Sequence, residues 1–260
     1  MKEESATDQK GYRVQGAAAV IKGLRLLMAI PELGRDATVR ALQEAVDMPR
    51  PTVYRLLNTL MQEGFVERNP VSGEYVLGRQ VVRLAQQSQA GSSLPAQVRG
   101  TLERISVATG ETVHLAVPYG CHMTFIDKVE SAEAVRMASY VGMPVPMHST
   151  SVGKAYLAVL DEPTREQYLE QLTLEPVTPH TITSLEALRE ELARTRARGY
   201  AIDDEENERG IICFGRAIWT TDGALAGAIS VSVPRYRLPE RDPERIVEAI
   251  THGYREAGLD

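Results

Sequence analysis

The sequence predicts an α+β protein in two parts: a small helical part that ends in a β-hairpin, and a larger part that mixes helices with antiparallel strands. In the first part, three segments with apolar residues at helical spacing precede two short β-like runs around a turn. After a break of small residues at 90–93, longer helical and β-like segments alternate to the end of the chain.

The first part contains three segments whose apolar residues recur at steps of three and four, the spacing of one helix face. These segments are residues 15–30, 38–46 and 50–63. We expect Pro31 to end the first helix, Thr38 to cap the second and Gly64 to end the third. Gly23 costs roughly 1 kcal/mol relative to alanine inside a helix, so the first helix should be less regular than usual.

A β-hairpin follows the third helix, because the β-like runs 65–68 and 74–77 flank the turn-forming residues 69–73. Helical spacing returns over residues 77–89. Residues 90–93, with the sequence AGSS, are the best candidate for a linker between the two parts.

The remainder of the chain is expected to form one α+β domain. Its helices are expected at 94–109, 150–160, 184–198 and 243–257. Its strands are expected at 112–117, 123–129, 135–140, 211–219 and 224–233. The pair Asp222-Gly223 favours a tight turn between the last two strands.

The two parts of the chain differ in net charge. The net charge of −6 by itself argues against a nucleic-acid partner, but residues 11–83 balance at +3 and residues 84–260 at −8. A phosphate-binding module carried by an acidic partner domain gives such a distribution.

The amino-acid composition excludes several classes of protein. Cys121 and Cys213 are too few for a disulfide framework or a cysteine zinc cluster, so we expect buried thiols, no metal and no cofactor. No apolar run approaches the ~20 residues that a membrane span needs, and the N-terminus lacks a signal-peptide stretch. We therefore expect a cytoplasmic protein.

The segment 50–63 has the features of a helix that reads DNA. Its apolar face is made by Val53, Leu56, Leu57 and Leu60. Its opposite face presents side chains that hydrogen-bond, and the free N–H groups at its N-terminus favour phosphate. The residues expected to contact DNA are Arg50, Thr52, Tyr54, Arg55 and Asn58 on this helix and Arg68 on the hairpin.

A helix, a tight turn, a second helix and a hairpin in this order predict a winged helix-turn-helix, whose second helix enters the major groove. Arg55 can bond two acceptors on one guanine. Arg68 can lie along the phosphate backbone or in the minor groove. The alternative is a plain three-helix bundle with a solvated polar face.

These residues also resemble the DNA-binding domain of the IclR family of bacterial regulators, through RPTVYRLLNTL at 50–60 and EGFV at 63–66. The resemblance continues through four further segments in family order. They are ETVHLAV (111–117), FIDKVES (125–131), MHSTSVGKA (147–155) and GYAIDDEENERG (199–210). There are two departures: residues 20–24 lack the acidic–arginine pair common near the start of the first helix, and Arg216 stands where small residues are common.

The resemblance implies a winged helix-turn-helix domain at 12–77, a linker helix at 78–91 and a GAF-like effector-binding domain with an antiparallel sheet at 92–260. It implies a homodimer or homotetramer that binds a palindromic or repeated DNA operator. It also implies that a small-molecule effector modulates this binding. Repression is favoured over activation, with catabolic genes as targets.

Seven effector-binding residues follow from the resemblance: Ser151, Val152, Gly153, Asp203, Cys213, Ser230 and Ser232. The first three lie near an expected helix N-terminus, which suits a carboxylate. Ser230 and Ser232 are two apart on a strand, so both hydroxyls face one side; the alternative is that they face water. For residues 204–206 we prefer a solvated acidic turn.

Two features leave alternatives open. The methionine-rich segment 135–147 is preferred as ordinary core, but if it lines the pocket it favours an aromatic acid as ligand. Arg216 has three open roles: contact with ligand, contact with a neighbouring subunit, or solvation.

The competing function class is a catalytic second domain. Gly153-Lys154 resembles the end of a phosphate loop, but His148 replaces the required glycine and Ala155 the Ser or Thr. His114 and His148 have no nucleophile partner visible in the sequence, so we expect no enzyme activity. A third class, an architectural DNA-binding protein without a ligand, is disfavoured by the large acidic second part.

Overall fold

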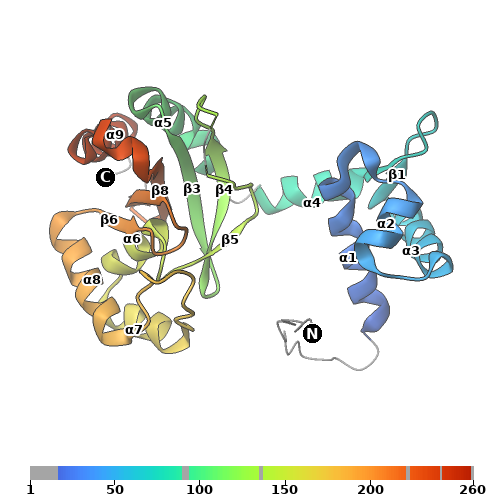
Figure 1. Cartoon of the computed structure of the whole chain (residues 1–260), viewed down its shortest axis with the longest axis horizontal. Coiled ribbons are helices and arrows are strands. Elements are labelled where there is room, and N and C mark those ends of the chain that lie inside the picture. Colours follow the sequence, from blue (N-terminus) through green and yellow to red (C-terminus); the bar gives the residue numbers. More distant parts are fainter. Residues whose placement is uncertain (1–16, 90–93, 135–136, 221–222, 241, 259–260) are drawn as a thin grey trace, which may run out of the picture. The chain divides into compact units, whose positions relative to one another are not determined.

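The computed structural model describes residues 17–89, 94–134, 137–220, 223–240 and 242–258, and the chain divides into two compact units, 1–92 and 93–260 (Figure 1). Four predicted features lie wholly or partly outside the described residues: the start of the first helix at 15–16, the linker at 90–93, the start of the strand at 135–136 and the turn residues Thr221 and Asp222. No described helix is long and apolar enough to cross a membrane.

The N-terminal unit has the predicted order of helices and hairpin. Its elements are α1 (Ala18–Leu33), the 3-10 turn η1 (Gly34–Asp36), α2 (Val39–Val46), α3 (Arg50–Gln62), β1 (Val66–Arg68), β2 (Tyr75–Leu77) and α4 (Arg79–Gln89). The first three helices pack together around the fully buried Leu26, Leu42 and Leu57 (Figure 1).

Helix α1 corrects two expectations. It continues past Pro31 to Leu33, because a proline this close to the end removes only one hydrogen bond and its ring stays exposed. Gly34 ends the helix instead, with φ of 55° and its N–H bonded to the carbonyl of Ile30. The helix is also unbroken at Gly23, which lies buried against Leu56 of α3. The predicted irregularity there is wrong.

Local signals set the turn into α3 and the hairpin. Thr38 caps α2 as predicted, since its hydroxyl accepts the N–H of Ala41 at 3.3 Å. Asp47 adopts the left-handed conformation that lets the chain reverse before α3. In the hairpin, Arg68 pairs with Tyr75, and the N–H of Tyr75 also bonds the carbonyl of Ala37 at 2.9 Å. This bond fixes the hairpin to the helical core.

The C-terminal unit contains one six-stranded antiparallel sheet of order β5-β4-β3-β8-β7-β6. Its strands are β3 (Thr112–Tyr119), β4 (His122–Val129), β5 (Pro144–Pro146), β6 (Ala201–Asp204), β7 (Ile211–Trp219) and β8 (Leu225–Pro234). Its helices are α5 (Leu94–Thr109), α6 (Ser151–Val159), α7 (Glu162–Gln171), α8 (Leu185–Arg198), the 3-10 turn η2 (Arg235–Glu240) and α9 (Pro243–Ala257).

The two faces of this sheet have separate apolar cores. On one face α5 and α9 pack over a cluster that includes Leu115, Phe214 and Ile229. On the other face α6 packs over a cluster that includes Phe125 and Met147, with α8 behind it (Figure 1). Since strand residues alternate between faces, each position on β3, β7 and β8 is assigned to one of the two layers.

The predicted strand at 135–140 is wrong for its described part, because residues 137–140 have no regular structure. The chain pairs with β4 further on, at β5, where Thr124 faces Pro144 and His122 faces Pro146. Prolines are tolerated there because β5 is an edge strand. Met137, Val145 and Met147 are buried in the core under α6, which agrees with the preferred interpretation of this segment as core.

Like β5, helix α7 and strand β6 were not predicted. Helix α7 has only one buried residue, Leu169, so it lacks the apolar periodicity that reveals a helix. Strand β6 ends with Asp204, the first residue of the solvated turn that we expected at 204–206. It forms because β7 offers a full set of backbone partners along Ala201–Asp204.

Candidate nucleic-acid interface and effector site

The outward face of α3 presents polar side chains that have no partner within the described chain. Val53 and Leu57 are buried on the inner side and pack into the core. Arg55 and Asn58 are exposed on the other side, and neither side chain bonds another described residue. This is the arrangement expected of a helix that presents donors to an external partner.

The first turn of α3 carries an ordered arginine. Arg50 donates to the hydroxyl of Tyr54 at 3.4 Å, and its guanidinium carbon lies 5.6 Å from the centre of that ring. Thr52, two residues further along the helix, is half-buried. The Arg50 charge is thus held next to the N-terminus of the helix, where the positive end of the helix dipole also favours an anion.

Arg68 lies on the hairpin, exposed, but it is bonded to the hairpin itself. Its Nε donates to the carbonyl of Gly73 at 3.2 Å, and its guanidinium carbon lies 5.9 Å from the centre of the Tyr75 ring. These contacts hold the guanidinium beside the turn. Glu67 and Glu74 lie on the same hairpin, so its charge is mixed.

Two rows of polar side chains cross the larger sheet on the face that α6 covers. The first row, in register across four strands, is Thr112, Ser232, Cys213 and Asp203. The second row, two residues along, contains His114, Ser230 and Gly215. Ser230 and Ser232 are both buried, so they point inward as expected, and the alternative that they face water is wrong.

The N-terminus of α6 lies on the second row. Thr150 caps the helix by accepting the N–H of Gly153 at 3.2 Å. A β-carbon added to Gly215 would lie 2.7 Å from the carbonyl of Ser151, so the backbones are in direct contact. Helix geometry leaves the N–H groups of Ser151 and Val152 without intrahelical acceptors. The positive end of the α6 dipole therefore lies over the polar rows.

His114 joins the two rows, and sequence reasoning did not include it among the binding residues. Its Nε2 lies 2.8 Å from the hydroxyl of Ser139, and its Nδ1 lies 3.4 Å from the hydroxyl of Ser232. Burial, together with a smaller effect of the Lys128 charge, lowers the pKa of His114 to about 3, so the ring is neutral at neutral pH. A neutral imidazole between two hydroxyls can reverse its donor and acceptor roles.

Asp203 ends the first row. Its Oδ1 accepts backbone N–H groups of Glu206 at 2.8 Å and Asn207 at 3.2 Å. Burial nevertheless raises the pKa of Asp203 to about 7, despite the opposing effect of Lys154. The carboxyl is therefore partly protonated near neutral pH. In that form it has a proton to donate.

The acidic segment after Asp203 is only partly the solvated turn that we expected. Asp204 and Glu205 both bind the exposed Arg235, at 2.5 Å and 2.7 Å. Glu206 is buried and pairs with the fully buried Lys154 of α6, so for this residue the expectation is wrong. Lys154 attracts it there because a buried ammonium needs a carboxylate partner.

The two cysteines and Arg216 take ordinary positions. Cys213 is buried, with its Sγ donating to Ser232 at 3.3 Å, and burial raises the pKa of its thiol. Cys121 is only half-buried, against the prediction. The Arg216 guanidinium stacks over Tyr254, whose hydroxyl donates to the Arg216 carbonyl at 2.7 Å. Contact with an α9 residue was not among the three roles considered for Arg216.

The seven expected effector residues therefore come together on one face, except that the side chain of Val152 packs into the apolar core. Among the described residues no group of three His, Cys, Asp or Glu side chains could hold a metal ion. We next compared the chain with known proteins. Residues 19–70 match the model of the IclR helix-turn-helix domain, and residues 87–256 match that of the bacterial transcriptional regulator IclR C-terminal domain.

Individual relatives agree with these models. The transcriptional repressor IclR of Escherichia coli is 32% identical over 232 residues, covering 88% of this chain and 84% of that protein. The crystal structure of Thermotoga maritima IclR superposes with a TM-score of 0.78 at 32% identity, covering 92% and 96% of the two chains. An IclR homologue of Microbacterium hydrocarbonoxydans, solved with 4-hydroxybenzoate, has the same fold at 24% identity, with a TM-score of 0.73 over 92% and 97%.

Proposed function

Because this chain belongs to the IclR family of bacterial transcriptional regulators, we propose that a small organic acid bound beside α6 modulates its binding to operator DNA. The chain is a DNA-binding regulator, and its relatives include repressors. We favour repression over activation, with catabolic genes as targets. We also propose a cytoplasmic location, since operator DNA lies there, and regulation without catalysis.

The observation that carries the effector proposal is the contact between the N-terminus of α6 and the polar rows. The dipole end and free N–H groups of the first turn favour a carboxylate. Ser230 and Ser232 add hydroxyl donors, and the neutral ring of His114 adds no charge of its own. Partly protonated Asp203 supplies a further donor.

We propose an aromatic acid as the effector. Phe125 stacks on His114 with ring centroids 4.4 Å apart, so an apolar aromatic surface adjoins the polar rows. The fold can hold such a ligand, because the Microbacterium protein was solved with 4-hydroxybenzoate. An acid with an aromatic body would place its carboxylate at α6 and its ring beside Phe125.

At the DNA we assign two kinds of contact. Arg55 and Asn58 are proposed to bond base edges in the major groove, and their exposure on α3 without a described side-chain partner supports this role. Arg50, Thr52, Tyr54 and the hairpin residue Arg68 are proposed to bond phosphates. A homodimer or dimer of dimers would present two such helices to a palindromic or repeated operator.

The proposed mechanism is thermodynamic linkage. The effector binds one arrangement of the C-terminal domain more tightly than the others. That preference biases the assembly of the DNA-binding domains, and operator affinity changes by the difference in effector binding energy.

The test is a thermal-shift screen of the purified chain against aromatic acids, followed by operator binding with each hit. A ligand at 100 times its dissociation constant adds ~2.7 kcal/mol of stability, which shifts the melting curve measurably. We expect a hit whose shift is lost in Ser230→Ala and which changes operator affinity. A shift that survives in Ser230→Ala would move the site elsewhere, and hits with no effect on DNA would contradict the linkage.

A further inference from the structure

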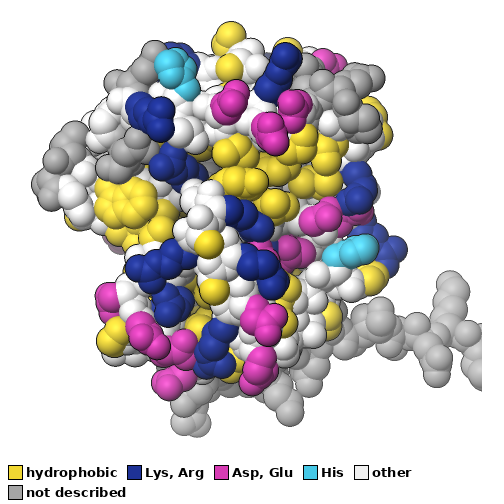
Figure 2. Space-filling model, turned by 90° about the vertical axis from the view of Figure 1, so that its left-hand side faces the viewer, with side chains coloured by type: hydrophobic (Ala, Val, Ile, Leu, Met, Phe, Trp, Pro, Cys, Tyr) yellow, Lys and Arg dark blue, Asp and Glu magenta, His cyan; other side chains and the backbone are white. Residues whose placement is uncertain are grey.

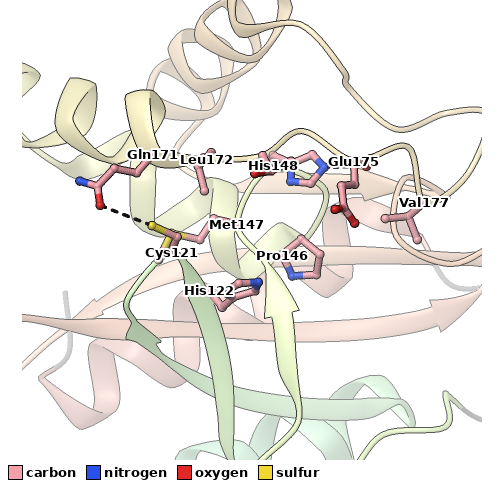
Figure 3. A pocket seen from close by; sticks show the side chains of 10 residues that line it. Cys121, His122, Pro146, Met147, His148, Gln171, Leu172, Glu175 and Val177 are labelled. Atoms are coloured by element: carbon pink, nitrogen blue, oxygen red, sulfur yellow. Dashed lines mark hydrogen bonds between the residues drawn. The ribbon is translucent and has the colours of Figure 1, made fainter. Parts of the chain in front are cut away.

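A separate cavity of about 220 Å³ opens in the C-terminal unit, beside the end of β5 and the segment after α7 (Figure 3). It is lined by Cys121, His122, Pro146, Met147, His148, Gln171, Leu172, Thr173, Glu175 and Val177. None of these is among the residues of the proposed effector site. The volume lies below the ~300–1,000 Å³ of pockets for drug-sized molecules, so it suits a small metabolite.

His148 supplies the most enclosed polar group of this cavity. Its Nε2 lies 3.1 Å from the backbone carbonyl of Glu175, which can only accept, so this nitrogen carries the proton. Burial lowers the pKa of His148; the bond to Glu175 and the charge of Glu175 oppose this shift, and Lys154 and His122 add to it. The pKa is lowered on balance, so the imidazole is neutral at neutral pH. The Nδ1 atom then has a lone pair and acts as an acceptor.

The formal charge in the lining comes from Glu175. Figure 3 shows its side chain next to the His148 ring, with the His122 ring across the cavity beyond Pro146. At another end Gln171 accepts a long bond, 3.9 Å, from the thiol of Cys121. A carboxylate and an imidazole acceptor on one wall, with no Lys or Arg in the lining, suit a ligand that brings positive charge and N–H donors.

We propose that this cavity is a binding site for a small primary amine, whose ammonium group is held between Glu175 and the Nδ1 of His148. The apolar walls of Pro146, Leu172 and Val177 cover the short carbon chain of the ligand. An organic acid is disfavoured there because it would meet the Glu175 charge. The domain thus offers an ammonium site and a carboxylate site that share no residue.

The reactivity of Cys121 can report whether the cavity is occupied. Cys121 lines it and is half-buried, whereas the other cysteine of the chain, Cys213, is buried under α6. A thiol reagent therefore reacts with Cys121 first, and a ligand in the cavity should slow that reaction. Cys213 serves as the internal control.

The experiment titrates the purified full-length chain, without DNA, with methylamine, ethanolamine and putrescine, and with glycolate as the matching carboxylate. Calorimetry measures binding, and the rate of Cys121 labelling measures protection. We expect saturable binding of at least one amine, one per chain, together with slower labelling of Cys121. Glycolate should leave the labelling rate unchanged.

Two variants make the result specific. Glu175→Gln should weaken amine binding about tenfold or more, because bonds to a charged group are the strong class. Glu170→Gln, exposed on α7 outside the cavity, is the matched control and should bind as the parent does. The proposal is overturned if no amine binds with protection, if glycolate protects Cys121 equally, or if Glu175→Gln binds unchanged. These measurements do not involve operator DNA, so they test the amine site independently of the proposed regulation.

Discussion

Lys154 and Glu206 form a buried ion pair through Oε1 of the glutamate, and the other oxygen, Oε2, has no hydrogen-bond partner among the described residues. Lys154 is fully buried on α6, so the pair ties this helix to the segment after β6. The view from the α8 side shows a surface of mixed positive, negative and apolar side chains (Figure 2), in contrast to the enclosed charges beneath α6.

Removing one member of this pair should lower the free energy of unfolding. Lys154→Met leaves the Glu206 charge buried and alone, so we expect a loss of about 3–5 kcal/mol in unfolding free energy. Urea denaturation measures it. In Lys154→Met/Glu206→Leu most of the lost unfolding free energy should return, because neither charge of the pair is then left buried without its partner. A loss no larger than that of an exposed lysine, such as Lys22→Met, would contradict the assignment.

On α3, Arg55→Ala should weaken operator binding by ~1–3 kcal/mol if the arginine reads a base, and should relax preference at that base pair. Fluorescence anisotropy with operator and scrambled DNA separates the two effects. Gln62→Ala, at the exposed end of the same helix, is the control for helix perturbation. Equal losses on both DNAs would make Arg55 a phosphate contact instead.

Arg50 should behave differently. Its place at the N-terminus of α3 makes it a phosphate contact, so Arg50→Ala should weaken binding to operator and scrambled DNA alike. The slope of log affinity against log salt should also fall by roughly 0.9, the value for one phosphate contact. An unchanged slope would exclude this role.

Asp203 should make stability depend on pH. Its folded pKa, about 7, lies above its ordinary value, so between these values the folded chain holds a proton that the unfolded chain has lost. Stability should therefore fall as pH rises from about 4 to 7, and the cost should be complete above 7. In Asp203→Asn, urea denaturation at several pH values should show a flatter profile. Identical profiles would mean that Asp203 ionises normally.

Two glycine-to-alanine changes should have opposite signs. At Gly23 a β-carbon would lie 4.0 Å from Leu56, an ordinary contact, so Gly23→Ala should stabilise by about 0.5–1 kcal/mol. At Gly215 it would meet the Ser151 carbonyl at 2.7 Å, so Gly215→Ala should destabilise by about 1–3 kcal/mol. Thermal denaturation of both variants measures this. The same sign at both sites would show that α6 can move off the sheet.

Sequence alone predicted the elements whose apolar residues repeat at one period. The bounds of α5, β7 and α9 agree with the predicted ranges, and the inner and outer faces of α3 are confirmed. Helix α7 was missed because it buries one side chain, and β5 because its prolines indicate a loop until β4 is present to pair with it.

The site was predicted less completely because its remaining members depend on distant pairing. The inward direction of Ser230 and Ser232 follows from strand alternation and was predicted correctly. His114 becomes a member only through the register of β3 with β8, and Glu206 is buried only because Lys154 faces it from α6. The residues next to His114 and Glu206 in the sequence do not reveal either role.

The backbone contacts of α6 bear on how effector choice can diverge among related proteins. A β-carbon at Gly153 would lie 2.3 Å from the Met147 backbone, and one at Gly215 would lie 2.7 Å from the Ser151 backbone at the helix start. We therefore expect every variant that folds to keep α6 in this position. New ligand preferences must arise on the strands, at positions such as 114, 230 and 232, and a directed library should diversify those codons while both glycines are kept.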